Sequence, residues 1–224
     1  MGWRCLCEIF YLHLQKFKNI SMKRFLSTLF CLLLAVVAFA QNANGHLKFM
    51  GIPITGTISQ FHTKLVAKGC TYDKVASSSN RAGIRTFKGN LAQNEVKIIV
   101  FYNTKTKIVY RVKALIYGIP EVLATQKYNE FKSFLTVKYD SRYTKTSSFE
   151  GKELIQYLAL RDKNTAIDPE NLPSRLSDVA FGMIKLYIST DLEGWNSPYN
   201  YYLHIDYYDQ INYEKNNKNI LDDL

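Results

Sequence analysis

The chain lacks most of the patterns that are typical of an enzyme or of a disulfide-rich scaffold. Three of its four cysteines (Cys5, Cys7 and Cys31) lie within the first 40 residues, which leaves Cys70 alone in the remainder. A single cysteine excludes an internal disulfide there, so the fold must be stabilised by a packed core. The sequence also contains no G-x-S-x-G, no glycine-rich phosphate loop and no H-E-x-x-H motif. The commonest serine-hydrolase, nucleotide-binding and zinc-protease motifs are therefore excluded.

The first 40 residues read as a leader. Lys23 and Arg24 precede an apolar run over residues 25–37, and Ala38-Phe39-Ala40 offers a small-x-small cleavage site before Gln41. This is the three-part pattern of a secretory signal peptide. The run is shorter than the roughly 20 residues that span a bilayer, which argues against a retained membrane anchor. We therefore expect an upstream extension (1–21), a signal peptide (22–40) cleaved near Ala40-Gln41, and an exported product, periplasmic or extracellular.

The basic excess of the chain comes partly from this leader. Residues 1–40 hold five of the 29 basic residues and one of the 19 acidic ones, so the rest carries +6 instead of +10. The remaining basic residues are spread along the sequence and form no block. Such a distribution favours solubility and weak anion affinity over a nucleic-acid footprint, and export makes a nucleic-acid partner improbable.

The first predicted element after the leader is a helix over residues 58–68. Thr57 and Gln60 have the spacing of a capping box, in which each side chain satisfies a free backbone N–H group. Gly69 is placed to adopt the left-handed conformation that ends helices. The apolar residues recur at helical spacing and predict one buried stripe: Ile58, Phe61, Leu65 and Val66.

Alternating segments follow a serine-rich loop at residues 77–80. The segment from Arg85 to residue 92 reads as a short strand. Residues 95–116 read as an antiparallel hairpin with a turn at 103–106. Its two strands place alternate apolar residues on one face: Val96, Ile98, Val100 and Tyr102, then Ile108, Tyr110, Val112, Ala114 and Ile116.

The second half repeats this order. A helix after Pro120 has an apolar stripe made of Tyr128, Phe131, Phe134, Leu135 and Tyr139. The segment "KELIQYLALRDK" fits either a helix or a strand, and "DPENLP" reads as a loop. Two strands follow, at 181–190 (Ile184, Leu186 and Ile188 alternating) and 201–209 (Tyr201, Leu203, Ile205 and Tyr207 alternating).

This order predicts an α+β fold with two tandem units, each laying a helix on an antiparallel hairpin or small sheet. The first unit covers residues 49–118 and the second covers 119–213. A flexible N-terminus (41–48) precedes them and a polar tail (214–224) follows.

Several segments resemble uncharacterised secreted proteins of gut commensal bacteria. The shared segments are "LKFMGIPITGTISQFHTKLVAKG", "TFKGNLA", "VYRVKALI" followed by "YNEFKSFLTVKYD", and "LHIDYYDQIN". Asp140 stands where that family usually has a glycine. The tandem helix-plus-sheet pattern also resembles the fold of the β-lactamase-inhibitor protein and of small outer-membrane assembly lipoproteins. The resemblance implies a fold and no activity.

Candidate catalytic and metal-binding residues are weakly supported. Cys70 and His62 are eight residues apart, about 12 Å along a helix, whereas a thiol–imidazole pair needs about 3 Å. We therefore interpret Cys70 as a small buried residue. His46, His204 and Asp206 supply no local metal-ligand spacing, and a surface ladder explains the last two better. Asp209 and Asn212 read as a local turn in which the carboxylate accepts backbone N–H groups. No cofactor is expected.

Paired carboxylates that would serve a hydrolase are not evident. Nothing in the sequence opposes Glu153, Asp162, Asp178, Asp191 or Glu193 to one another.

Aromatic residues near the C-terminus give the best lead to function. In a strand, Tyr202 and Tyr208 face opposite to Tyr201 and Tyr207, so one set points away from the core. The candidate ligand-contact residues are Trp195, Tyr199, Tyr202, His204, Asp206 and Tyr208. Exposed Tyr and Trp offer rigid contact area to proteins and flat faces to sugars, although Tyr also suits half-buried strands.

We therefore expect a non-enzymatic binding protein whose partner is another envelope or extracellular protein. A carbohydrate-binding accessory protein that uses Trp195, and an unrecognised hydrolase, are the alternatives.

Overall fold

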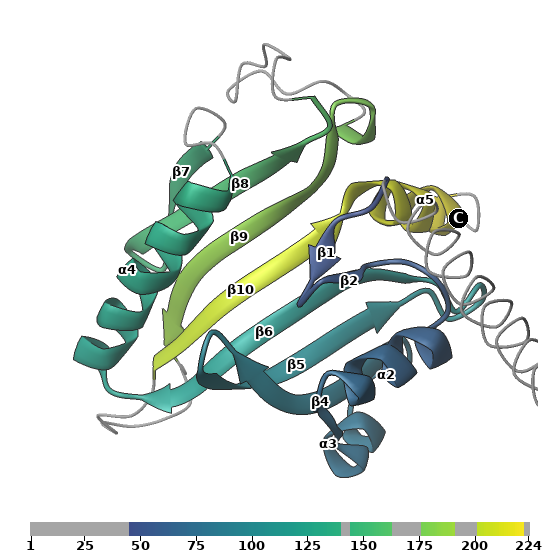
Figure 1. Ribbon diagram of the computed structural model, residues 1–224, viewed down its shortest axis with the longest axis horizontal. Coiled ribbons are helices and arrows are strands. Elements are labelled where there is room, and N and C mark those ends of the chain that lie inside the picture. Colours follow the sequence, from purple (N-terminus) through teal and green to yellow (C-terminus); the bar gives the residue numbers. More distant parts are fainter. Residues whose placement is uncertain (1–44, 140–143, 163–175, 191–200, 222–224) are drawn as a thin grey trace, which may run out of the picture. The chain divides into compact units, whose positions relative to one another are not determined.

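The computed structural model describes residues 45–139, 144–162, 176–190 and 201–221, with side chains up to residue 217. It confirms an α+β protein (Figure 1). The strands are β1 (Lys48–Phe49), β2 (Ile52–Pro53), β3 (Thr71–Tyr72), β4 (Ile84–Leu91), β5 (Asn94–Tyr102), β6 (Val109–Ile119), β7 (Thr144–Phe149), β8 (Lys152–Leu160), β9 (Ala180–Thr190) and β10 (Tyr201–Asp209). The helices are α2 (Ile58–Ala67), α3 (Lys74–Ser79), α4 (Glu121–Lys138), the short 3₁₀ turn η2 (Leu176–Asp178) and α5 (Gln210–Leu221).

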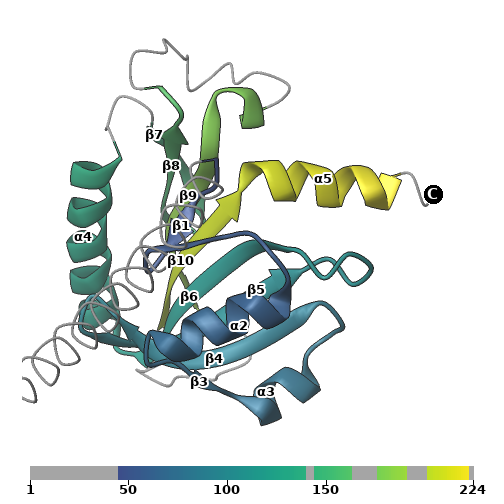
Figure 2. The same ribbon diagram turned by 45° about the vertical axis from the view of Figure 1, so that its right-hand side comes forward.

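Eight strands form one antiparallel sheet in the order β3-β4-β5-β6-β10-β9-β8-β7, and β1 pairs with β2 separately. The sheet is continuous because β6 pairs with β5 on one side and with β10 on the other. Helices α2 and α4 and the β1–β2 hairpin lie on the same face of this sheet (Figures 1 and 2). The core lies between them and the sheet.

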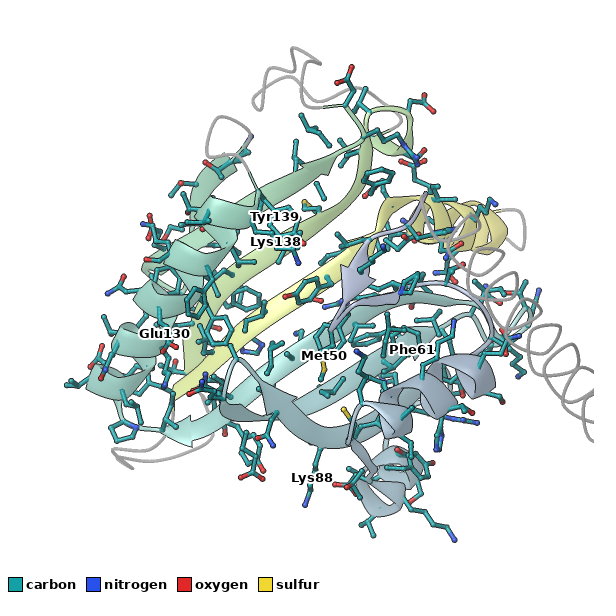
Figure 3. The ribbon with its side chains drawn as sticks, in the orientation of Figure 1. Met50, Phe61, Lys88, Glu130, Lys138 and Tyr139 are labelled. Atoms are coloured by element: carbon teal, nitrogen blue, oxygen red, sulfur yellow. The ribbon has the colours of Figure 1, made fainter. Side chains whose placement is uncertain are left out.

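The prediction for α2 is confirmed at both ends. The Thr57 side chain accepts the Gln60 N–H, and the Gln60 side chain accepts the Thr57 N–H, which makes the capping box. Gly69 has φ +83°, in the left-handed region. The predicted stripe is wrong at Val66, which is 47% exposed. Phe61 lies fully buried between α2 and the sheet, whereas Lys88 extends away from β4 (Figure 3).

Strand alternation is confirmed in β5, β9 and β10, where the apolar residues predicted at every second position face the core. In β6 the prediction is wrong at Tyr110. An irregularity between Phe101 and Tyr102 shifts the register, so Val109 and Val112 are buried and Tyr110 is not. A β-bulge of this kind moves the following side chains to the other face.

The helix after Pro120 is confirmed as α4, with Ala124, Tyr128, Phe131 and Leu135 buried. The predicted stripe is wrong at Phe134, which is 51% exposed. The ambiguous segment from Lys152 is the strand β8. The predicted loop "DPENLP" lies outside the described residues.

Two predicted irregular segments are helical instead. The serine-rich segment belongs to α3, whose first turn is capped by Asp73 accepting the Ala76 N–H. The hydroxyls of Ser78 and Ser79 donate to the Val75 carbonyl and so satisfy that acceptor inside the helix. The polar tail predicted from residue 214 belongs to α5, which continues to Leu221.

Asp209 joins β10 to α5, and the local-turn interpretation of Asp209 and Asn212 is confirmed. Asp209 Oδ1 accepts the Asn212 N–H at 3.0 Å, which caps α5. Its Oδ2 accepts the Leu47 N–H at 2.9 Å, and His46 Nδ1 lies 3.0 Å from both oxygens. The Asn212 amide donates to the carbonyls of Ile54 and Val109. These contacts attach the segment around β1 and β2 to the end of the sheet.

Candidate functional site

The face of the sheet opposite α2 and α4 carries a cluster of aromatic and charged side chains from β5, β6, β10 and β9. We call it the open face and define it by Phe101, Arg111, Lys113, Lys185, Tyr187, His204, Asp206 and Tyr208. Tyr213 of α5 contacts its end through the rings of Tyr110 and Tyr208. The sheet pairing places these residues next to one another, because Asp206 lies opposite both Lys113 and Lys185, and Tyr208 lies opposite Arg111.

An Arg–Asp pair lies at the centre of the open face. Arg111 Nε and Nη2 donate to the two carboxylate oxygens of Asp206 at 2.8 and 2.5 Å. The guanidinium lies between the rings of Phe101 and Tyr208, 4.4 and 4.7 Å from their centroids. Burial alone would lower the pKa of Arg111, but the hydrogen bonds and charge of Asp206 outweigh it and raise the pKa. Ring and carboxylate contacts therefore hold the guanidinium in one orientation.

A second group of side chains adjoins this pair. The rings of Tyr187 and His204 stack with centroids 4.4 Å apart and planes 3° apart, and His204 Nε2 lies 2.7 Å from Ser189 Oγ. Lys113 Nζ donates to the Tyr187 hydroxyl at 3.1 Å and lies 3.8 Å from Asp206. Burial, helped by the charges of Lys113 and Arg111, lowers the pKa of His204 to about 3. His204 is therefore neutral at pH 7.

Burial also dominates the titration of the neighbouring groups. It lowers the pKa of Lys113, against the opposing effect of Asp206, and it raises the pKa of Tyr187 to about 12. The Nδ1 atom of His204 is buried and has no hydrogen-bond partner among the described residues. The imidazole is thus uncharged, with its ring stacked on Tyr187.

The open face is positively charged. On β5, β6, β9 and β10 it carries four basic side chains against two acidic ones: Lys97, Arg111, Lys113 and Lys185 against Glu95 and Asp206. Asp206 is 1% exposed, and its charge is already matched by Arg111. The charge that the face presents to a partner is therefore positive.

Four of the six candidate ligand-contact residues lie within the described residues. His204, Asp206 and Tyr208 lie together on the open face, but the surface ladder predicted for His204 and Asp206 is wrong, because Asp206 is buried. Asp206 is buried since β6 brings Arg111 against it. Tyr202 lies half-buried at the start of β10. Trp195 and Tyr199 lie outside the described residues.

The residues considered for catalysis take structural positions. Cys70 is 4% exposed, as the sequence predicts, and burial raises the pKa of its thiol. His62 packs its ring against Tyr72 and Phe87. Glu153 accepts from the Tyr128 hydroxyl and from Lys132. No three His, Cys, Asp or Glu side chains of the described segments come together as metal ligands. Asp191 and Glu193 lie outside these segments.

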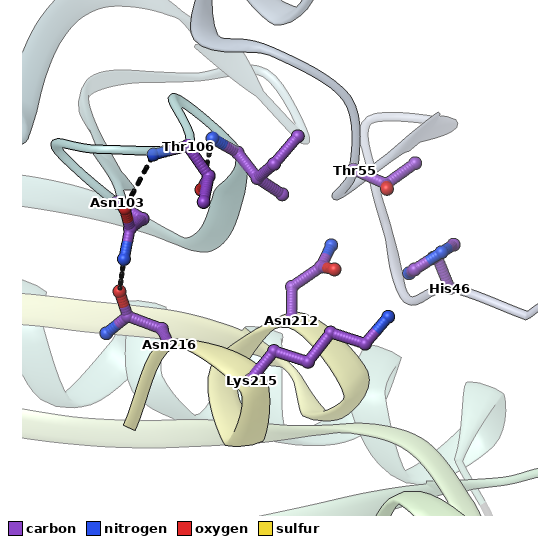
Figure 4. A pocket seen from close by; sticks show the side chains of 8 residues that line it. His46, Thr55, Asn103, Thr106, Asn212, Lys215 and Asn216 are labelled. Atoms are coloured by element: carbon purple, nitrogen blue, oxygen red, sulfur yellow. Dashed lines mark hydrogen bonds between the residues drawn. The ribbon is translucent and has the colours of Figure 1, made fainter. Parts of the chain in front are cut away.

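A polar pocket of about 370 Å³ lies beside α5, and no sequence pattern predicts it (Figure 4). Three separate segments line it: the strap of residues 46–55, the turn at 103–108, and α5. Its main polar side chains are His46, Thr55, Asn103, Asn212, Lys215 and Asn216. Asn212, Lys215 and Asn216 belong to α5, which the sequence predicts as a local turn followed by a polar tail. No sequence pattern therefore predicts that these side chains line one pocket.

Comparison with known proteins found no relative of this chain. The chain matches no protein-family model, no curated protein and no solved structure. Among the described residues, no helix combines the length and apolar character needed to cross a membrane.

Proposed function

We propose that the protein is an exported, non-enzymatic binding protein whose open face binds an acidic segment of another envelope or extracellular protein. The Arg111–Asp206 pair carries this proposal. A guanidinium fixed between two rings and a carboxylate loses little freedom when a partner packs on it. Tyr and Arg are also the side chains that contribute most strongly at the centres of protein interfaces.

The charge of the open face supports an acidic partner. Lys185 lies opposite Asp206 and over the Tyr208 ring, 5.2 Å from its centroid, and Lys97 lies on the same face of β5. Basic side chains at the rim of an interface accelerate association with an acidic partner and make the rate depend on salt.

Export rests on the signal-peptide pattern of residues 22–40. We also propose that the chain consists of two tandem units and that it belongs with the secreted family that it resembles. The order of elements supports two units, because α2 precedes β4–β6 and α4 precedes β7–β10, with β6 and β10 adjacent at the centre of the sheet.

Site-specific photo-crosslinking would test the docking face. A benzoylphenylalanine at Phe149, which is 37% exposed and packs on Tyr187, reports contacts at the open face. The same probe at Phe134, 51% exposed on α4, is the matched control. We expect a discrete adduct with an envelope or culture-fluid protein from position 149 and none from 134. The identified partner should carry an acidic segment at the cross-linked site.

A charge-reversed variant, Lys97→Glu with Lys185→Glu, should lose the adduct while keeping its melting temperature. Equal adducts from both probe positions, or an adduct that survives charge reversal, would refute the proposal. If no protein is captured and a glycan array responds to the wild type but not to Trp195→Ala, the carbohydrate-binding alternative replaces it.

A further inference from the structure

The pocket beside α5 has the polar groups of a small-molecule site. Its volume of about 370 Å³ lies within the range of small-ligand pockets, roughly 300–1,000 Å³. None of its lining residues belongs to the open face. The two sites are therefore independent in composition, and this inference does not depend on the proposed protein partner.

The charges at the pocket favour an anion. Lys215 lines it, and no carboxylate is among its described lining residues. Asp209, which contacts the lining residue His46, is fully buried, and its oxygens already accept from the N–H groups of Leu47 and Asn212. A ligand carboxylate would thus meet an ammonium group without a competing exposed acid.

The neutral groups favour hydroxyls. Asn216 uses its Oδ1 to accept from Asn103 Nδ2 at 2.9 Å, which leaves its Nδ2 as a donor. Asn212 uses its Nδ2 to donate to two backbone carbonyls, which leaves its Oδ1 as an acceptor. His46 directs Nδ1 at Asp209, so Nε2 is the ring nitrogen that a ligand can reach. Thr55 adds a hydroxyl that both donates and accepts.

These groups point into one space from opposite sides. Figure 4 shows Thr55 and His46 on the strap facing Asn212 and Lys215 on α5. Ile108 is the apolar residue among the described lining, so a ligand with a large apolar surface would leave these polar groups unpaired. A ligand that bears one carboxylate and several hydroxyls would satisfy them.

We propose that this pocket binds a sugar acid of monosaccharide size, a hexuronate. Its carboxylate pairs with Lys215, and its hydroxyls exchange hydrogen bonds with Asn212, Asn216 and Thr55. The pocket walls are held by the Asn103–Asn216 bond and by Asp209, so the site is formed before the ligand enters.

Isothermal titration calorimetry of the purified protein with D-galacturonate and D-glucuronate tests this. We expect a dissociation constant below about 1 mM for at least one of them. D-Galactose, which lacks the carboxylate, should bind at least about tenfold more weakly, since it forgoes the charge-assisted hydrogen bond. Inorganic phosphate and acetate, which lack the ring hydroxyls, should also bind at least about tenfold more weakly.

Matched variants locate the site. Lys215→Met should weaken hexuronate binding about tenfold or more, and Asn216→Ala about three- to tenfold. Asn217→Ala, the adjacent exposed residue of α5, and Lys64→Met on α2 lie outside the pocket and should leave the affinity unchanged. All four positions are on helix surfaces, and an unchanged melting temperature will show that each variant folds.

If neither hexuronate binds at a concentration of about 10 mM, the proposal is overturned, because the affinity would then be too low for a specific site. Binding that Lys215→Met and Asn216→Ala leave intact, or that Asn217→Ala weakens equally, would also overturn it. Equal affinity for phosphate would show a simple anion site and refute the role given to the hydroxyls.

Discussion

Replacing Asp209 by alanine should destabilise the protein far more than loss of a helix cap alone. Asp209 performs two tasks, because it caps α5 through Asn212 and also satisfies the buried N–H of Leu47. Asp73 is the matched control, since its carboxylate caps α3 through the Ala76 N–H and accepts no second backbone N–H among the described residues. Its ion pair with the exposed Lys88, at 3.9 Å, adds little to stability.

The expected magnitudes follow from these contacts. Loss of a cap costs about 0.5–2 kcal/mol, which is the whole effect expected for Asp73→Ala. Asp209→Ala adds the cost of leaving the Leu47 amide unpaired, about 1–3 kcal/mol. The free energy of unfolding should thus fall by about 1.5–5 kcal/mol in Asp209→Ala, a large part of the roughly 5–15 kcal/mol typical of a domain.

Urea unfolding followed by circular dichroism would measure both variants, and hydrogen exchange would locate the effect. We expect faster exchange of the Leu47 amide in Asp209→Ala and unchanged exchange there in Asp73→Ala. Asp209→Asn, which keeps one acceptor oxygen, should fall between wild type and alanine. If Asp209→Ala and Asp73→Ala differ by less than about 1 kcal/mol, Asp209 acts as a cap only and the reasoning fails.

Two further outcomes follow from buried groups. Folding lowers the pKa of His204 from 6.5 to about 3, so the unfolded chain binds more protons than the folded one between these pH values. The free energy of unfolding should therefore fall as the pH drops from about 6.5 towards 3, and it should fall less steeply in His204→Gln. Urea unfolding midpoints at about pH 7 and about pH 4.5 would measure this difference. A matching slope in both proteins would mean that the imidazole is protonated in the fold. At Gly89, an added Cβ would lie 2.7 Å from Cys70 Sγ and 3.1 Å from Ile98 Cδ1, so Gly89→Ala should cost about 1–3 kcal/mol. Most of that loss should disappear in a Cys70→Ala background, and a fully additive double mutant would show that the sulfur is not the obstacle.

Sequence periodicity predicts the strands well where one face is buried. In β5, β9 and β10 the core needs an apolar side chain at every second position, so the residues that face the core are apolar along most of each strand. The β6 irregularity escapes this reasoning, because no glycine or proline marks it and Tyr110 suits either face. Alternation predicts which face of the sheet each side chain occupies only up to the first β-bulge.

The helices that were missed lack the signals used to find helices. Composition made the serine-rich segment read as a loop, but Asp73 caps it and its serines bond within the helix. Over residues 210–217, where its side chains are described, helix α5 has no apolar stripe. It is fixed instead by Asp209 at its start and by Asn212 against two carbonyls. Polar contacts position both helices, together with the Tyr213 ring in α5, and a search for hydrophobic periodicity does not detect such contacts.

Three of the eight residues of the open face were predictable from the sequence, and their environment was not. Alternation correctly places His204, Asp206 and Tyr208 on the same side of β10, away from the core. Their burial depends on Arg111, which is 95 residues away from Asp206 in the sequence and meets it only because β6 and β10 are neighbours. Sequence spacing holds no information about that pairing.

One junction positions both proposed sites. At Asp209 the chain leaves β10, whose side chains form the open face, and enters α5, whose side chains line the pocket. The Arg111–Asp206 pair is held by strand pairing on both sides of β10, whereas the pocket depends on α5 being tied to the strap by Asp209. Asp209→Ala should therefore abolish hexuronate binding under conditions where the protein remains folded and still cross-links through the open face. Loss of both activities together would mean that the open face also depends on the strap.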